Sequence, residues 1–138
     1  MKKENLFGYV PAIATPFNKK GEIMEDAFVD LFEFLIERGA TCVCIAGDNG
    51  ESWSLSAEER GRLVRLAKDT SRGRVPIMMG ISAPTIDASL SYIRAAEENG
   101  ADVLLSMPQT YVLKASDAEL MARFDKVSEA TNRPLVLY

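Results

Sequence analysis

A polar turn follows an apolar run in the first half of the chain. Gly47-Asp48-Asn49-Gly50-Glu51 comes directly after the run CVCIA. The two glycines allow close approach of the backbone to a ligand, and main-chain N–H groups in such a turn can bind an anion. Asp48 and Asn49 place a carboxylate and an amide between them. The pattern indicates an anion-binding loop, although a strand-to-helix turn with Asx capping would use the same residues.

Apolar runs like the one before this turn recur along the chain at intervals of roughly 30 residues, about the length of one βαβ repeat. None alternates as a half-exposed strand would, so both faces of each run are expected to be buried. They predict five parallel strands: Val10–Thr15, Cys42–Gly47, Pro76–Ile81, Asp102–Met107 and Pro134–Tyr138.

Amphipathic segments between these runs predict four helices. Glu25–Arg38 has apolar residues at helical spacing, and Gly39 follows it. Two later segments begin with capping-box spacing, a serine followed three residues later by a glutamate. The starts of the last three helices are therefore placed at Ser56, at Thr85 or Asp87, and at Ser116.

The order of these elements favours an α/β fold, the (β/α)8 TIM barrel. A complete barrel needs about 250 residues, whereas this sequence has 138. We expect residues 1–138 to be the N-terminal part of a single barrel domain, with about the first five strands and four helices. Residues 1–7 would form a short N-terminal tail, and the active parent protein would be longer.

Charge and hydropathy exclude several classes of function. The net charge is −4 and the basic residues are scattered, whereas nucleic-acid binding requires a concentrated basic surface. No apolar run approaches the ~18 residues of a membrane span, and no apolar segment of a signal peptide follows the two N-terminal lysines. A cytoplasmic protein that binds neither nucleic acid nor membrane is expected.

The chain contains no histidine, which removes the nucleophile schemes that depend on one. Cys42 and Cys44 lie two apart on one predicted strand, so their side chains point the same way and an unstrained disulfide is not expected. They are interpreted as small buried residues, and a zinc site lacks ligands. Catalysis would therefore use carboxylates, tyrosines, amides or lysine.

In a barrel, the loops that follow the strands form the active face. These loops carry Thr15, Asp48, Asn49, Glu51, Ser82, Gln109, Thr110, Tyr111, Lys114 and Tyr138. Plain alternatives exist for several of them. Thr15 could cap the turn before Pro16, and Tyr111 could cover the core. Glu51 is interpreted as a structural group that binds backbone N–H groups of the next loop, and Trp53 in that loop as a packing residue.

Several motifs together resemble the dihydrodipicolinate synthase and N-acetylneuraminate lyase family of class I aldolases, from about Gly8 onward. The matching segments are PAIATPF at 11–17, GDNGE at 47–51, LSAEER at 55–60, VPIMMG at 75–80, GAD at 100–102 and PLVLY at 134–138. The resemblance implies a barrel that is often tetrameric and binds pyruvate or another 2-oxo acid through a lysine Schiff base. It implies no metal and no organic cofactor, and a homo-oligomer, tetramer or dimer.

The resemblance also assigns roles to single residues. Tyr138 matches the tyrosine that relays protons at the Schiff base, and Tyr111 is either the second relay tyrosine or its neighbour. Asn49 stands where the family holds the 2-oxo acid carboxylate, with Gly47, Gly50 and Thr15 as further substrate-binding candidates. Asp48 replaces the hydroxyl residue of the synthase branch, and an ionised carboxylate can accept a proton but not donate one.

The family lysine lies on the sixth strand, beyond Tyr138. None of the seven lysines present is on a predicted strand, so the 138-residue chain alone is expected to be inactive. For the parent we expect a carbon–carbon lyase similar to dihydrodipicolinate synthase. The alternatives are an aldolase for 4-hydroxy-2-oxo acids or sugar-derived 2-oxo acids and, in a different class, an inactive half-barrel with a structural or binding role.

Overall fold

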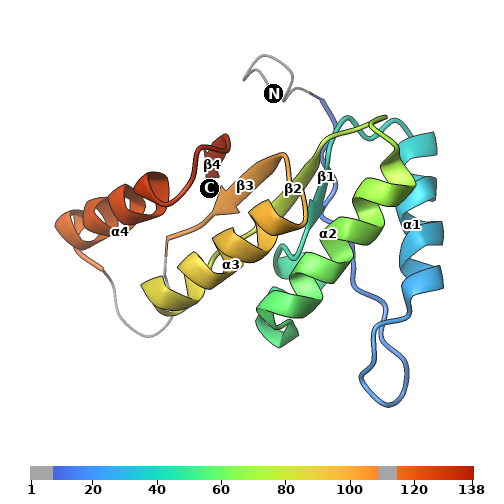
Figure 1. Ribbon diagram of the computed structural model, residues 1–138, viewed down its shortest axis with the longest axis horizontal. Helices are drawn as coiled ribbons and strands as arrows, with labels where there is room; N and C mark the ends of the chain where they lie inside the picture. The colour runs from blue at the N-terminus through green and yellow to red at the C-terminus, as the bar shows by residue number, and fades with distance from the viewer. Residues whose placement is uncertain (1–7, 109–114) are drawn as a thin grey trace.

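The computed structural model describes residues 8–108 and 115–138, which form a parallel sheet with helices packed on it (Figure 1). The sheet has the strand order β1-β2-β3-β4, so each helical crossover leads to the adjacent strand. The strands are β1 (Val43–Ile45), β2 (Ile77–Gly80), β3 (Val103–Ser106) and β4 (Leu135–Leu137). The helices are α1 (Glu25–Glu37), α2 (Ala57–Ser71), α3 (Ile86–Glu98) and α4 (Asp117–Glu129).

The predicted first strand, Val10–Thr15, is present only as an extended segment beside β1. It makes one isolated parallel bridge, between Ala12 and Cys44. The N–H of Ile13 donates to the carbonyl of Cys44 at 3.0 Å, and the N–H of Cys44 donates to that of Pro11 at 2.9 Å. A regular ladder does not form because proline has no N–H to donate and because Ala46, with φ +52°, turns β1 away. The sheet therefore has four strands and one extended neighbour.

The predicted helix starts are confirmed, including both capping boxes. The Ser56 hydroxyl accepts from the N–H of Glu59 at 3.2 Å, and the Glu59 carboxylate accepts from the N–H of Ser56 at 2.8 Å. Ser116 begins α4 in the same way. Thr85, rather than Asp87, is the N-cap of α3. Within the described ranges, no helix combines the length and the apolar character needed to cross a membrane.

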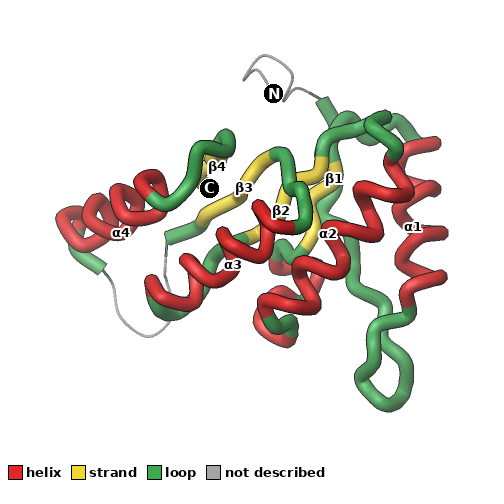
Figure 2. The backbone as a smooth tube through the Cα atoms, in the orientation of Figure 1, coloured by secondary structure: helices red, strands yellow, loops and turns green. Residues whose placement is uncertain are grey.

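β1 and β2 are buried on both faces, as the lack of alternation predicts, and β3 is buried except for the half-buried Leu105, whereas β4 is only partly buried. The larger core lies between sheet and helices and includes Phe28 and Phe32 of α1 together with Ile45, Ile77 and Met79. Here α2 and α3 lie side by side across the sheet (Figure 2). The smaller core is on the other face of the sheet and is formed by Cys42, Cys44, Met78 and Val103, with Val10, Leu105 and Val136 packed against it.

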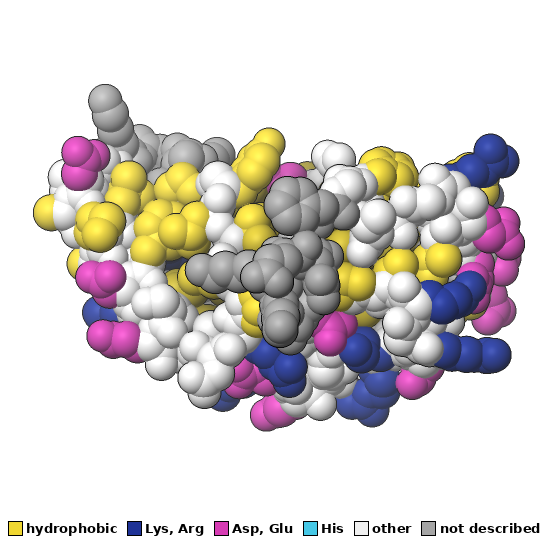
Figure 3. Space-filling view, turned by 90° about the horizontal axis from the view of Figure 1, so that it is seen from above, with side chains coloured by type: hydrophobic (Ala, Val, Ile, Leu, Met, Phe, Trp, Pro, Cys, Tyr) yellow, Lys and Arg dark blue, Asp and Glu magenta, His cyan; other side chains and the backbone are white. Residues whose placement is uncertain are grey.

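The last strand is the least covered part of the sheet. Leu137 is 55% exposed and Tyr138 is 83% exposed, whereas β1 and β2 are fully buried. Figure 3 shows hydrophobic side chains gathered on the side of the molecule away from most of the charged ones. The cavity described next opens on the face of the sheet that carries the smaller core.

Candidate active site

A cavity of about 600 Å³ lies at the carboxyl ends of the strands. The strands contribute apolar lining residues, and the polar lining comes from the segments that follow β1 and β4. The lining residues are Val10, Ala12, Cys44, Gly47, Asp48, Asn49, Met78, Leu105, Met107, Val136 and Tyr138. An apolar base with a few polar groups at its rim is the usual form of a small-molecule site.

The turn after β1 positions the polar rim. Asp48–Gly50 forms a short 3-10 turn, in which the N–H of Gly50 donates to the carbonyl of Gly47 at 3.0 Å and that of Glu51 to the carbonyl of Asp48 at 3.0 Å. The N–H groups of Asp48 and Asn49 open the turn and have no acceptor within it. These two N–H groups, rather than those nearest Gly50, are the ones that an anion could use.

Two of the predicted site residues, Thr15 and Gly50, support this turn without lining the cavity. The hydroxyl of Thr15, which is 5% exposed, donates to the carbonyl of Gly50 at 2.8 Å. A Cβ on Gly50 would lie only 2.8 Å from the carbonyl oxygen of Ile13, so the close approach requires glycine. Neither Thr15 nor Gly50 is among the residues that line the cavity.

The structure brings four other predicted site residues together. Gly47, Asp48, Asn49 and Tyr138 all line the cavity, and the last three are exposed at its rim. Tyr111 lies outside the described residues. The roles assigned to these side chains remain predictions, but the segments that carry them meet at one end of the sheet.

The cavity also contains a cysteine that is not a plausible nucleophile at neutral pH. Burial raises the pKa of the Cys44 thiol to about 12 and that of Cys42 to about 11. Both thiols are free and both side chains are buried. The interpretation of the two cysteines as small buried residues is confirmed.

No lysine is among the residues that line this cavity in the described part of the chain. Lys68, on α2, instead pairs with Asp102 at 3.0 Å, and the same carboxylate accepts from the N–H of Ile77 at 2.8 Å. Lys114 lies outside the described residues. Among the described residues, the lining of this cavity offers main-chain N–H groups and an amide that could hold a small anion, together with one phenol, and it includes no amine.

Sequence reasoning missed the role of Arg60. Its guanidinium is buried and donates to main-chain carbonyls of the loop that follows β1 and of the last residue of β2. The sequence did contain a signal that Arg60 is buried. Arg60 stands at the spacing i, i+3, i+4, i+7 with Leu63, Val64 and Ala67, and these three side chains lie on the buried face of α2.

Two side chains near the turn differ from expectation. The Glu51 side chain is exposed, and among the described residues no hydrogen bond to a backbone N–H involves its carboxylate. Its main-chain carbonyl, rather than its side chain, accepts from the Ser54 hydroxyl at 2.8 Å. Trp53, expected to pack, is 73% exposed. A short turn with a left-handed residue, Glu51 at φ +54°, directs both side chains outward.

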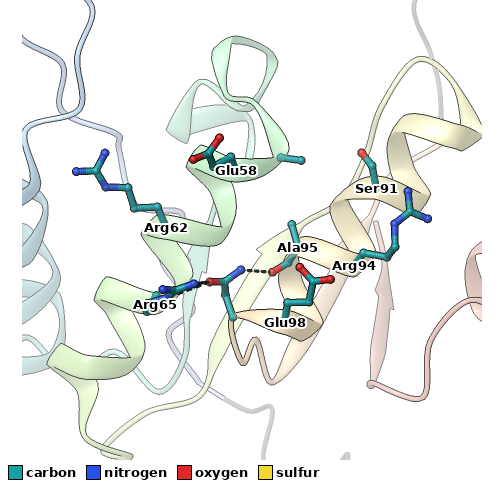
Figure 4. Close-up of a pocket in the computed structure, with 9 residues that line it drawn as sticks. Glu58, Arg62, Arg65, Ser91, Arg94, Ala95 and Glu98 are labelled. Carbon is teal, nitrogen blue, oxygen red and sulfur yellow. Dashed lines mark hydrogen bonds between the residues drawn. The ribbon is translucent and has the colours of Figure 1, made fainter.

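A second cavity of about 610 Å³ lies between α2 and α3, away from the strand ends. Its arginines do not converge on one point: Arg62 and Arg94 lie at opposite sides of it (Figure 4). Arg62 pairs with Glu25 of α1, and Arg65 donates to Asn99 at 2.6 Å. These contacts hold helices together and leave the cavity at the strand ends as the candidate active site.

The parallel order, the helical crossovers and a polar rim at the carboxyl ends of the strands define part of a (β/α)8 barrel with an active-site end. The model of the dihydrodipicolinate synthetase family matches residues 5–138. The chain belongs to this family.

Relatives and solved structures agree with this assignment. The 4-hydroxy-tetrahydrodipicolinate synthase of Salinibacter ruber is 35% identical over 139 residues, which cover all of this chain and 46% of that protein. The structure of the chloride-inhibited dihydrodipicolinate synthase from Acinetobacter baumannii complexed with pyruvate has a TM-score of 0.89 and 30% identity, and the match covers 95% of this chain and 45% of that one. N-acetylneuraminate lyase from Mycoplasma synoviae has a TM-score of 0.84 and 25% identity, and the match covers 94% of this chain and 45% of that one. The chain thus spans less than half the length of these relatives and corresponds to their N-terminal half.

Proposed function

We propose that the complete protein carrying this chain is a Schiff-base lyase that acts on pyruvate or another 2-oxo acid, similar to dihydrodipicolinate synthase. The observation that carries the proposal is the meeting of Gly47, Asp48, Asn49 and Tyr138 around one cavity at the strand ends. Membership of the family and the pyruvate complex of the A. baumannii relative support the choice of a 2-oxo acid.

In this proposal the turn after β1 binds the carboxylate of the 2-oxo acid. The Asn49 amide and the open N–H groups of Asp48 and Asn49 are the donors, and hydrogen bonds to a charged group stabilise by about 1.5–3 kcal/mol each. Asn49→Ala should therefore raise the KM for pyruvate about tenfold or more, whereas Asn49→Thr should retain most of the binding. Tyr138 lines the same cavity and would transfer the proton as the imine forms.

The reactive amine would come from outside the described chain. A lysine condenses with the 2-oxo group, water leaves, and the resulting iminium withdraws electrons from the adjacent carbon so that an enamine can form. We place this lysine on the next strand of the complete barrel and propose that residues 1–138 alone form no imine.

Borohydride trapping tests the proposal directly. The complete protein is incubated with pyruvate and borohydride, and its intact mass is compared with that of residues 1–138 treated in parallel. One reduced pyruvate on the complete protein alone is expected. No adduct on the complete protein would overturn the proposed activity, and an adduct on the short chain would point to Lys114 as the amine.

A second candidate substrate class is favoured by the carboxylate of Asp48 at the cavity rim. A carboxylate there disfavours a second anionic substrate group and accepts hydrogen bonds from hydroxyls, which suits cleavage of a 4-hydroxy-2-oxo acid or a sugar-derived 2-oxo acid. Asp48→Ser should then lower kcat/KM for cleavage of hydroxylated 2-oxo acids and leave pyruvate trapping intact. An unchanged preference would remove this candidate.

A further inference from the structure

Arg60 is a buried cation whose partners are backbone carbonyls. The side chain is 1% exposed. Its guanidinium donates to the carbonyl of Gly80 at 2.8 Å, to that of Leu55 at 3.4 Å and to that of Ser52. The guanidinium carbon also lies 3.7 Å from the centre of the Tyr92 ring. Among the described residues, no ion pair includes Arg60.

Burial of a cation without a carboxylate partner is energetically unfavourable. Removing the guanidinium from water is unfavourable, and an apolar side chain of similar size would fill the same volume without that penalty. Burial accordingly lowers the pKa of Arg60. What an apolar residue could not do is join several carbonyls from separate segments, because only the guanidinium offers donors in a fixed planar fork.

The carbonyls that Arg60 joins come from the loop after β1 and from the end of β2. Ser52 and Leu55 follow the turn after β1, whereas Gly80 is the last residue of β2. Thr15 donates to the carbonyl of Gly50, at the end of the same turn. The segment that follows Asp48 and Asn49 is thus held through main-chain atoms by Thr15 at Gly50 and by Arg60 at Ser52 and Leu55, and Arg60 ties it to the end of β2.

We propose that Arg60 is a positioning residue for the 2-oxo acid site, holding residues 47–55 in the conformation that binds the carboxylate. The inference rests on the proposed function for its ligand. Without the guanidinium, residues 47–55 would be less ordered before the ligand binds. Part of the binding free energy would then be used to order them, so the affinity for the ligand would be lower. The bound state would be the same once formed, so the KM for pyruvate should rise about tenfold while kcat changes less.

The test compares three variants of the complete protein. Arg60→Met keeps length and removes every donor, Arg60→Lys keeps the charge with a single donor group, and Arg65→Met is the control on the exposed side of the same helix. For each, half-saturation by pyruvate is measured by borohydride trapping, kcat is measured at saturating pyruvate, and amide hydrogen exchange is followed in residues 47–55.

Arg60→Met should raise the half-saturating pyruvate concentration about tenfold, change kcat less than about threefold and speed exchange in residues 47–55. Arg60→Lys should be intermediate, and Arg65→Met should match the wild type. If Arg60→Met folds and is half-saturated at the same pyruvate concentration as the wild type, the inference is overturned. If Arg60→Met does not fold, the half-saturating pyruvate concentration of Arg60→Lys decides in the same way.

The two proposals fail in different ways. A wild-type protein without a pyruvate adduct would refute the proposed function, yet the exchange rates in residues 47–55 would still report whether Arg60 holds the turn. Unchanged exchange in the Arg60 variants would overturn the positioning role whether or not the protein binds pyruvate.

Discussion

Substitution of Gly80 by alanine probes the contact that joins β2 to the end of β1. A Cβ on Gly80 would lie 2.1 Å from the carbonyl oxygen of Ala46 and 2.9 Å from its carbonyl carbon. Neither partner can move easily. The Gly80 carbonyl is bound by Arg60 at 2.8 Å, β2 is paired with β1 and β3, and Ala46 already has a left-handed φ of +52°.

The expected destabilisation follows from this overlap. Ordinary Cβ contacts are 3.4 Å or longer, so the methyl group would displace backbone by more than an ångström. Overpacking of a well-packed core usually destabilises by about 1–3 kcal/mol. For a domain of 150–250 residues, a loss of about 2 kcal/mol lowers Tm by about 4–8 °C.

Gly47→Ala is the matched control at the same end of the sheet. A Cβ there would meet only the Cys44 sulfur at 3.5 Å and the Ala12 Cβ at 3.6 Å, and the backbone φ of −76° accepts alanine. Thermal unfolding of the complete protein should show a clear decrease in Tm for Gly80→Ala and little change for Gly47→Ala. Equal Tm values for the two variants would refute the steric reasoning.

Three further predictions concern charge, backbone strain and thiol chemistry. Hydrogen bonds from Ser56 lower the folded-state pKa of Glu59 below 4.5. The ionised carboxylate therefore stabilises the folded protein fully above pH 4.5, and this contribution is lost as the pH falls through the lowered pKa. The Tm difference between wild type and Glu59→Gln should vanish in acid. Arg72→Gly should raise the free energy of unfolding by about 1 kcal/mol, because glycine adopts the left-handed φ of +49° without strain. Arg38→Gly, at a φ of −85°, should bring no such gain. Chemical denaturation of each variant measures the difference. Cys44 should resist alkylation at pH 8 in the native protein and react once unfolded, as peptide mass spectrometry would show, because its pKa is about 12.

The repeating pattern of strands and helices was predictable because it depends on local signals. Capping serines at 56 and 116 place α2 and α4, apolar runs place the four strands, and apolar residues at helical spacing place α1. Thr85, one of the two predicted starts, begins α3. The first strand was overestimated, since apolar composition does not reveal that Ala46 turns the neighbouring strand away. Polar residues after the strands pointed to the end of the sheet where the candidate cavity lies.

The support of the candidate site was harder to predict because it runs through main-chain atoms. Thr15 was assigned to the ligand, but its hydroxyl is used by the carbonyl of Gly50. The partners of Arg60 are carbonyls of residues 5, 8 and 20 positions away in the sequence, and every residue type has a carbonyl. A pattern of side chains therefore cannot identify them, whereas it can identify a capping box, in which both partners are particular side chains.

This division of roles bears on Asp48, which the resemblance drawn from the sequence places where the synthase branch has a hydroxyl residue. The conformation of the turn is set by Thr15, Gly50 and Arg60 through the backbone, while the side chains at positions 48 and 49 are exposed. A change of side chain at position 48 thus leaves the supporting contacts in place, and exposed substitutions of this kind usually alter stability by no more than about 0.5 kcal/mol. The folding of the turn does not require a carboxylate there. In the proposed function, Asp48 therefore acts on what enters the cavity rather than on what holds the sheet together.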